Sequence, residues 1–302
     1  MSVDDPVPAD ETGFDRLLGF TIPGRNARGR VIRLGPVLDE ILSAHAYPPA
    51  ARGLLAEALV LTALIGGLLK EEGAQLTMQA QASGGAVSLL VCDFRDGELR
   101  GYLQFDEKRL ARLGANPRIE TLFGEGYLAI TFEPGATQQR FQGIVPLEGA
   151  SLGEACEIYF SRSEQVPTLI RLAVRCDAAH CVAGGLLVQY LPEGEEGRER
   201  LHAQSDYPEW EHVAALAGST RHDELIDPAL SLDALIWRLF HEEPEVRVLR
   251  GSPLSRGCRC SVEHYEQILA RFPEEDRAEM RDENGDIVVD CAFCSRLFKI
   301  AI

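Results

Sequence analysis

The chain has 302 residues, enough for one large domain or for a main domain with smaller appendages. Hydrophobic residues make up 45% of it and charged residues 25%, which is typical of a globular protein and excludes wholesale disorder. The formal net charge of −17 argues against nucleic acid or an anionic membrane as the main partner, because phosphate binding depends on surplus Lys and Arg. Eight cysteines are too few for a disulfide scaffold and indicate a reducing compartment, so a tight cysteine cluster would be a candidate metal or redox site.

The N-terminal segment, residues 1–13, is acidic and interrupted by proline, which predicts a loose tail rather than an export signal. The longest apolar stretch, Ala58 to Leu69, has 12 residues and contains two glycines. A membrane-spanning helix needs about 20 apolar residues. The sequence therefore predicts a soluble, cytoplasmic protein with no membrane partner.

The first strong periodicity predicts a long helix from Pro49 to Lys70. Leucine, isoleucine and alanine recur there at steps of three and four residues, and Glu57 is a rare polar exception. Because nearly every face of this helix is apolar, we expect it to be buried on most sides.

Strand patterns follow the helix. Leu76 to Ala82 alternates apolar and polar residues with a period of two, and turn residues separate it from further strand patterns. These patterns cover Ala86–Cys92, Glu98–Leu103, Tyr127–Phe132, Arg140–Val145, Thr168–Arg175 and Val182–Leu191. Short connections between them favour antiparallel pairing.

A helix interrupts the strands at Ser151, where Glu154 completes a capping box. The pattern as a whole predicts an α+β fold for residues 1–197, a main domain of antiparallel sheet with packed helices.

Residues 198–250 are predicted to form an amphipathic helical linker region. Its apolar side chains recur at helical spacing, and they include Trp210, Val213, Leu216, Leu235, Ile236, Leu239 and Phe240. Such short helices cannot bury an apolar face alone, so they must dock onto another surface. Permanent packing on the main domain and a releasable contact both fit this pattern.

The last segment, residues 251–302, is predicted to form a small module around one metal ion. Cys258 and Cys260 have C-x-C spacing, and Cys291 and Cys294 have C-x-x-C spacing. Four thiolates in two such pairs can close a tetrahedral Zn²⁺ site, which leaves no open position for a catalytic water. We therefore expect one structural Zn²⁺ held by these four cysteines and no enzymatic activity at the site.

Charge and size suggest that this module is more than a static zinc ribbon. Residues 255–302 carry seven basic and ten acidic side chains, whereas a nucleic-acid-binding finger should be basic. Each cysteine pair is also close enough in sequence to form a disulfide. Zinc contributes about 10–16 kcal/mol to the folding of small modules, against about 3–5 kcal/mol from a core of this size, so oxidation should remove the metal and unfold the module.

With this cysteine pattern, the sequence resembles the redox-regulated holdase chaperones, the 33 kDa chaperonin or heat-shock protein 33 family. The cysteine pattern resembles the zinc redox switch of that family. Further matching segments are Leu76-Thr-Met-Gln79, Gly101-Tyr102, Gln142–Gly149, Ser163-Glu-Gln-Val-Pro-Thr168 and Ala183–Gln189. The resemblance covers nearly the full length of the chain.

The resemblance implies a cytosolic, ATP-independent chaperone that is inactive while reduced and zinc-bound. It further implies that oxidative stress forms the disulfides Cys258–Cys260 and Cys291–Cys294, releases zinc, and unfolds the switch and the linker region. The activated protein would form a homodimer and bind unfolding client proteins, with the apolar linker side chains named above as candidate client-binding residues.

Two other functions remain open for the cysteine module. A thiol–disulfide oxidoreductase could use Cys291-Ala-Phe-Cys294. However, a strand pattern precedes this pair, and no thioredoxin-like βαβ pattern surrounds it. A static zinc interaction module would keep its metal under peroxide.

Other candidate sites in the sequence have simpler explanations. Gly149–Gly153 matches the G-x-S-x-G of serine hydrolases, but Ser151 is explained as a helix cap. We interpret Cys176, His180 and Cys181 as isolated residues rather than metal ligands, because no fourth ligand lies nearby in sequence. The sequence contains no Walker A or dinucleotide-binding motif, so no nucleotide is expected as a partner.

Overall fold

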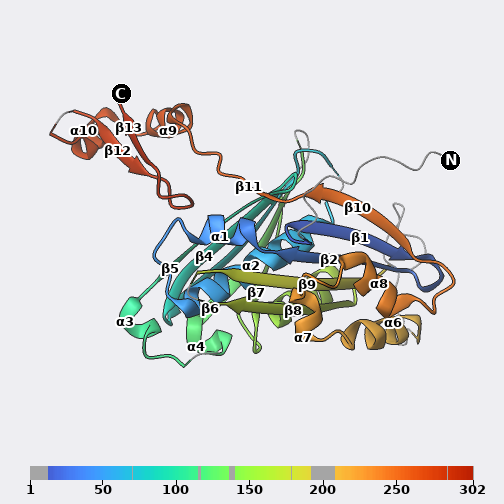
Figure 1. Cartoon of the computed structure of the whole chain (residues 1–302). Helices are drawn as coiled ribbons and strands as arrows, with labels where there is room; N and C mark the ends of the chain where they lie inside the picture. Colours follow the sequence, from blue (N-terminus) through green and yellow to red (C-terminus); the bar gives the residue numbers. More distant parts are fainter. Residues whose placement is uncertain are drawn as a thin grey trace.

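The computed structural model of the chain describes residues 13–69, 71–114, 117–135, 140–177, 179–191, 208–283 and 285–301. Most of the predicted acidic tail lies outside the described residues, and so does the boundary expected at residues 197 and 198. The described chain forms two sheets, a set of helices around them and a small C-terminal module (Figure 1).

The first sheet has five strands in the order β10-β1-β2-β9-β8, all antiparallel to their neighbours. Its strands are β1 (Arg16–Ile22), β2 (Ala27–Leu34), β8 (Thr168–Cys176), β9 (Cys181–Tyr190) and β10 (Arg247–Pro253). Both faces of this sheet are covered, which explains why β9 is almost continuously apolar and buried.

The second sheet has six strands in the order β11-β5-β4-β3-β6-β7. Its strands are β3 (Gln75–Gly84), β4 (Val87–Arg95), β5 (Glu98–Phe105), β6 (Gly124–Glu133), β7 (Phe141–Pro146) and β11 (Ser255–Arg256). Strands β3 to β7 pair antiparallel, and the short β11 pairs parallel with β5.

Helix α2 (Pro49–Gly66) lies between the two sheets and contacts both. Leu76, Met78 and Ala80 of β3 are fully buried in the same core, as their alternation predicts. The length and hydropathy of α2 would suit a membrane span, but 72% of it is buried inside the protein, as in a core helix. The remaining helices of this part are α1 (Pro36–Leu42), α3 (Glu107–Leu110), α4 (Ile119–Phe123) and α5 (Leu152–Tyr159), with the short η1 (Pro23–Arg25) and η2 (Phe160–Glu164).

Three helices cover the other face of the first sheet: α6 (Pro208–Gly218), α7 (His222–Ile226) and α8 (Leu232–Phe240). They form a second core with apolar side chains of β1, β2 and β9, and the rings of Phe20 and Phe240 lie 5.4 Å apart within it. Their apolar faces are therefore satisfied by docking rather than by contacts among themselves.

The C-terminal module contains α9 (Val262–Leu269), α10 (Glu274–Met280) and the antiparallel pair β12 (Ile287–Asp290) and β13 (Leu297–Ile300). It has a small core of its own around Leu269, Phe298 and Ile300. In Figure 1 the module lies at one end of the molecule, joined through β11 to the edge of the six-stranded sheet.

The α+β fold of antiparallel strands and packed helices is confirmed, with four differences from the sequence analysis. The strands form two sheets around α2 rather than one, and α2 ends at Gly66 instead of Lys70. Strands β1 and β2 were not predicted. Residues 247–250, assigned to the linker region, belong to β10, which continues past residue 251 into Pro253.

Candidate metal centre and its contacts

The four cysteines of the candidate metal centre come from two places in the chain. Cys258 and Cys260 follow β11, which is fixed to the core by the N–H of Gly257 donating to the carbonyl of Leu99 at 2.9 Å. Cys291 and Cys294 lie in the turn between β12 and β13. The turn is closed by the N–H of Ser295, which donates to the carbonyl of Cys291 at 2.8 Å.

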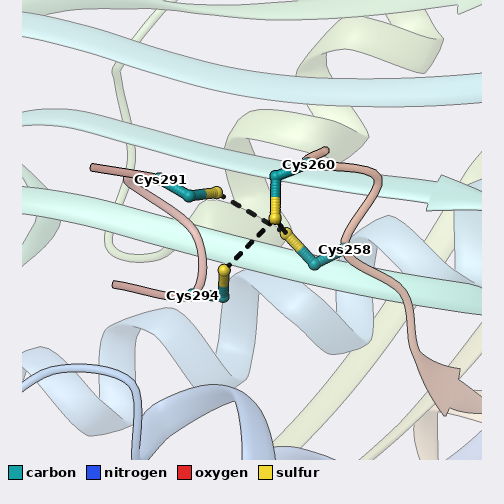
Figure 2. Close-up of side chains that lie close together, drawn as sticks. All are labelled: Cys258, Cys260, Cys291 and Cys294. Atoms are coloured by element: carbon teal, nitrogen blue, oxygen red, sulfur yellow. Dashed lines mark hydrogen bonds between the residues drawn. The ribbon is translucent and has the colours of Figure 1, made fainter. Parts of the chain in front are cut away.

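The four sulfur atoms converge, all within 4.8 Å of one another (Figure 2). Cys258 Sγ lies 3.3 Å from Cys260 Sγ and 3.6 Å from Cys291 Sγ, and Cys260 Sγ lies 3.5 Å from Cys294 Sγ. Ligands about 2.3 Å from a tetrahedral Zn²⁺ lie about 3.8 Å from one another. Four soft sulfur donors at these separations fit a closed Cys₄ metal site, as the sequence spacing predicts.

The environment of the site favours a thiolate at Cys291. Burial opposes ionisation of this thiol, but hydrogen bonds from the Tyr265 hydroxyl and from backbone N–H groups outweigh burial and lower the pKa of Cys291 to about 7. The Tyr265 ring in turn packs against Phe298, with centroids 5.1 Å apart. The module core thus positions a hydrogen-bond donor beside the sulfur cluster.

The turn that carries the second cysteine pair contacts the main domain through Phe293. The guanidinium carbon of Arg100, on β5, lies 4.2 Å from the centroid of the Phe293 ring, in cation–π geometry. The Tyr102 ring, on the same strand, meets Phe293 edge-on at 6.4 Å. Arg100 is held in place by Asp93, whose carboxylate accepts from Nε and Nη2 at 2.7 and 2.6 Å.

A second contact joins the same turn to the loop between α1 and α2. His45 Nε2 donates to the carbonyl of Ala292 at 2.7 Å, and the hydroxyl of Ser295 donates to the carbonyl of Ala44 at 2.7 Å. The C-x-x-C turn therefore lies against two elements of the main domain, and a change in its shape would disturb both contacts.

The apolar residues predicted in the linker region lie in α6 and α8, facing the first sheet. Val213, Leu235, Ile236, Leu239 and Phe240 are buried there. Trp210 and Leu216 are partly buried against the same cluster. The described linker helices thus turn their apolar faces inward, against the first sheet.

Arg33 of β2 fastens these helices to the sheet. Its side chain is fully buried and donates to three backbone carbonyls, those of Glu224 at 3.0 Å, Leu225 at 2.9 Å and Leu230 at 2.8 Å. Gly184 makes room for the same helix, because a Cβ there would lie 2.2 Å from the carbonyl oxygen of Leu225. Helix α7 therefore rests directly on the backbone of β9.

A charged cluster fastens the other two linker helices. The Glu243 carboxylate, only 2% exposed, accepts from Arg25 at 2.9 Å and pairs with His212 of α6 at 2.7 Å. Arg25 also pairs with Glu209 of α6. Burial raises the pKa of Glu243, but hydrogen bonds from Arg25 and His212 prevail and hold this pKa below its usual value.

Two sites set aside in the sequence analysis have different outcomes. Ser151 caps α5 as predicted: its hydroxyl accepts from the N–H of Glu154 at 3.2 Å, and no strand leads straight into the turn among the residues described there. The interpretation of Cys176 and Cys181 as isolated thiols is wrong. They are joined in a disulfide across the β8–β9 hairpin.

Sequence reasoning missed several residues that contact the linker helices or the metal centre. Arg33 and His45 carried no usable signal, because their partners are backbone carbonyls distant in sequence. Cys176 and Cys181 did carry one. The strands predicted to end at Arg175 and begin at Val182 leave these two cysteines opposite each other across a short turn.

Comparison with known proteins agrees with the geometry of the site. A family model described as "Hsp33 protein" matches residues 15–301. A 33 kDa chaperonin from Caulobacter vibrioides is 40% identical over 302 residues, which cover 97% of both chains. A 33 kDa chaperonin from Ectopseudomonas mendocina is 35% identical, covering 92% of this chain and 90% of the relative.

A solved structure shares the fold. The crystal structure of the 33 kDa chaperonin from Thermotoga maritima matches with a TM-score of 0.74 at 22% identity, covering 95% of each chain. The family model and the curated relatives extend over nearly the whole sequence, the cysteine module included. The chain therefore belongs to the Hsp33 family of chaperones.

Proposed function

We propose that the protein is a redox-regulated, ATP-independent holdase chaperone of the cytoplasm. In this proposal it is inactive while its four C-terminal cysteines are reduced and hold Zn²⁺, and oxidative stress activates it to bind unfolding proteins and prevent their aggregation. The observation that carries the proposal is the convergence of four sulfur atoms from two sequence-local pairs within 4.8 Å.

The metal would be held by Cys258, Cys260, Cys291 and Cys294. When bound, Zn²⁺ would keep the four sulfurs as thiolates and supply most of the folding free energy of the module. The module's own core supports this dependence because it is small, with five buried apolar or cysteine residues among those described.

Oxidation would act on the cysteines two at a time. In each pair, Cys258 with Cys260 and Cys291 with Cys294, two thiolates would give up two electrons to a peroxide, form one disulfide and leave water as the reduced product. The short sequence separation within each pair supports local pairing. Both disulfides together would consume all four metal ligands, release the zinc and unfold the module.

Unfolding of the module would be passed to the linker helices through the chain that joins them. Residues 241–257 connect α8 to Cys258, and β10 and β11 within this segment run along the edges of the two sheets. Release of α6 and α8 would expose their apolar faces, with Trp210, Val213, Leu216, Leu235, Ile236, Leu239 and Phe240 as proposed client-binding residues. The activated form would be a homodimer, and neither nucleotide nor catalysis would be required.

An aggregation assay tests the proposal. Light scattering from a thermally unfolding client should be suppressed by the peroxide-treated protein and not by the reduced, zinc-loaded protein. Equal suppression by both forms would refute redox control.

The metal assignment has its own measurement in the same preparation. Cys258→Ser should lower the zinc content below one ion per chain and loosen the module, because three sulfurs cannot close the tetrahedral site. Cys156→Ser is the matched control, since Cys156 is fully buried in the main domain. A Cys258→Ser variant that keeps stoichiometric zinc would show that the four sulfurs do not form one site.

A further inference from the structure

The main domain contains a second pair of cysteines at the turn end of the β8–β9 hairpin. Cys176 is the last residue of β8 and Cys181 the first of β9, and they are direct partners in the antiparallel register. The N–H of Asp177 donates to the carbonyl of His180 at 2.9 Å, so Cys176 and Cys181 occupy the adjacent position without backbone hydrogen bonds. Side chains lie closest at such positions, and the two Cα atoms are 4.1 Å apart in the disulfide.

Neighbouring elements hold this end of the hairpin in place. Asp39 of α1 accepts the N–H of Cys181 at 2.9 Å through one carboxylate oxygen and contacts His180 Nδ1 at 2.8 Å through the other. Arg52 of α2 donates to the carbonyls of Asp177 and Ala179, at 3.3 and 3.2 Å. The two sulfur atoms can therefore meet without any unfolding of the main domain.

The two cysteines differ in access to solvent. Cys176 is partly exposed and lines an open cleft of about 1330 Å³ beside Leu54, Pro48 and Leu110. Cys181 is only 1% exposed. A small oxidant can thus reach Cys176 from the cleft, while Cys181 is placed behind it to complete a disulfide.

From this geometry we propose that Cys176 and Cys181 form a second redox site that responds to peroxide independently of the metal centre. The Cys176 thiolate attacks one oxygen of hydrogen peroxide, breaks the O–O bond and becomes a sulfenic acid, with one water released after proton uptake. The Cys181 thiol then attacks the sulfenic sulfur, the S–S bond forms, and the hydroxyl leaves as a second water. Two thiols lose two electrons in total and one peroxide gains them.

The site differs from both other kinds of cysteine in the chain. The metal-centre sulfurs lie in the C-terminal module and would react as ligands of a bound ion. Cys92 and Cys156 are fully buried, and burial raises the pKa of both thiols, which disfavours the reactive thiolate. These two serve as internal controls for general oxidation.

Peptide mass mapping can distinguish this pair from the other cysteines. Cys176 and Cys181 fall in one tryptic peptide, residues 176–198, so their disulfide makes that peptide lighter by two hydrogen atoms. Cys291 and Cys294 share another peptide, residues 282–296, and Cys92 and Cys156 lie in two further ones. The full-length, zinc-loaded protein would be reduced, treated with stoichiometric hydrogen peroxide, alkylated and digested.

We expect peptide 176–198 to be alkylated before peroxide and oxidised after it, with both alkylation sites restored by a thiol reductant. Cys92 and Cys156 should remain reduced in the same sample. A pair that stays reduced under peroxide would overturn the proposal, and so would a disulfide that persists under the reductant in the folded protein.

Single substitutions test the assigned order of reaction. Cys181→Ser should leave a sulfenic acid at Cys176 that is labelled by dimedone, because the second thiol is missing. Cys176→Ser should leave Cys181 unlabelled, because that side chain is buried. Labelling of Cys181 alone would overturn the assignment. The inference does not rest on chaperone activity, since the peptide readout would stand even if the aggregation assay showed no redox control.

Discussion

Arg33 carries a buried positive charge, and none of its described hydrogen bonds goes to a carboxylate. Its guanidinium instead donates to three carbonyls at the end of α7 and in the following loop. The carbonyls of Glu224 and Leu225 lie at the C-terminal, negative end of α7, where a fixed cation is favourable. The planar guanidinium reaches each carbonyl with a different nitrogen, whereas a lysine has only one nitrogen from which to donate.

We therefore predict that Arg33→Lys weakens the attachment of the linker helices by about 1–3 kcal/mol, because at least one buried carbonyl loses its donor. The chain has two tryptophans, Trp210 in α6 and Trp237 in α8, so tryptophan fluorescence reports directly on these helices. The midpoint of the fluorescence change in urea should fall.

The same strand supplies a matched control for that measurement. Arg28→Lys alters a guanidinium on the same strand whose described hydrogen bonds go to the side chain of Gln189. It should shift the urea midpoint much less. Equal shifts for Arg28→Lys and Arg33→Lys would mean that Arg33 stabilises the strand and not the linker.

At the scale of elements, Glu243 joins η1, α6 and the end of α8 in one charged cluster. The carboxylate has its pKa held low by Arg25 and His212 despite burial. When a carboxylate has a lower pKa in the docked state than in the undocked state, its charge stabilises docking at any pH above the undocked pKa, which for glutamate is ordinarily 4.5. This stabilisation is lost as the pH falls through the lower pKa of the docked state. Docking of the linker helices should therefore weaken in acid.

This predicts a fall in linker stability when the pH is lowered from 6 toward 3, followed by tryptophan fluorescence in urea at each pH. Glu243→Gln should lower stability at pH 6 and flatten the dependence on pH, because the neutral amide cannot gain the proton. Glu245→Gln, at an exposed carboxylate paired with Arg247, should keep the wild-type profile. An unchanged profile in Glu243→Gln would assign the acid sensitivity to other groups.

The sequence predicted elements best where one local pattern decided the outcome. The alternation of Leu76 to Ala82 and the cap at Ser151 are local, and both are confirmed. Strand β2 was missed because Arg28, Arg30 and Arg33 interrupt its apolar residues, and Arg33 is buried only through partners almost two hundred residues away. The division into two sheets depends on such long-range packing around α2.

The candidate metal centre was predictable because its ligands form two pairs that are each local in sequence. The spacing of Cys258 with Cys260 and of Cys291 with Cys294 sets the chemistry of the site in any fold that brings the pairs together. The contacts of the site with the main domain were not predictable, because Phe293 and His45 meet partners that only the folded sheets bring near.

At the scale of the whole molecule, the docked C-x-x-C turn should depend on Phe293. Phe293→Ala removes the cation–π contact with Arg100, worth about 0.5–2 kcal/mol, and leaves all four cysteines in place. We predict unchanged zinc content but a larger radius of gyration by small-angle X-ray scattering, as the module separates from β5.

A second aromatic of the module provides the control for this prediction. Phe272→Ala changes an exposed ring near the end of α9 and should alter neither zinc content nor size in solution. Loss of zinc from Phe293→Ala would show that Phe293 supports the metal site itself rather than its docking.

Strands β10 and β11 lie in the connection between the linker helices and the cysteine module, and each is also an edge strand of a sheet. They add the outermost strand to each of the two sheets, against β1 and β5. If β10 and β11 dissociate from the sheets, β1 and β5 become edge strands with unpaired backbone N–H and C=O groups. An extended polypeptide of almost any composition could form backbone hydrogen bonds with such an exposed sheet edge. Recognition of misfolded chains would then depend on main-chain pairing as well as on apolar side chains.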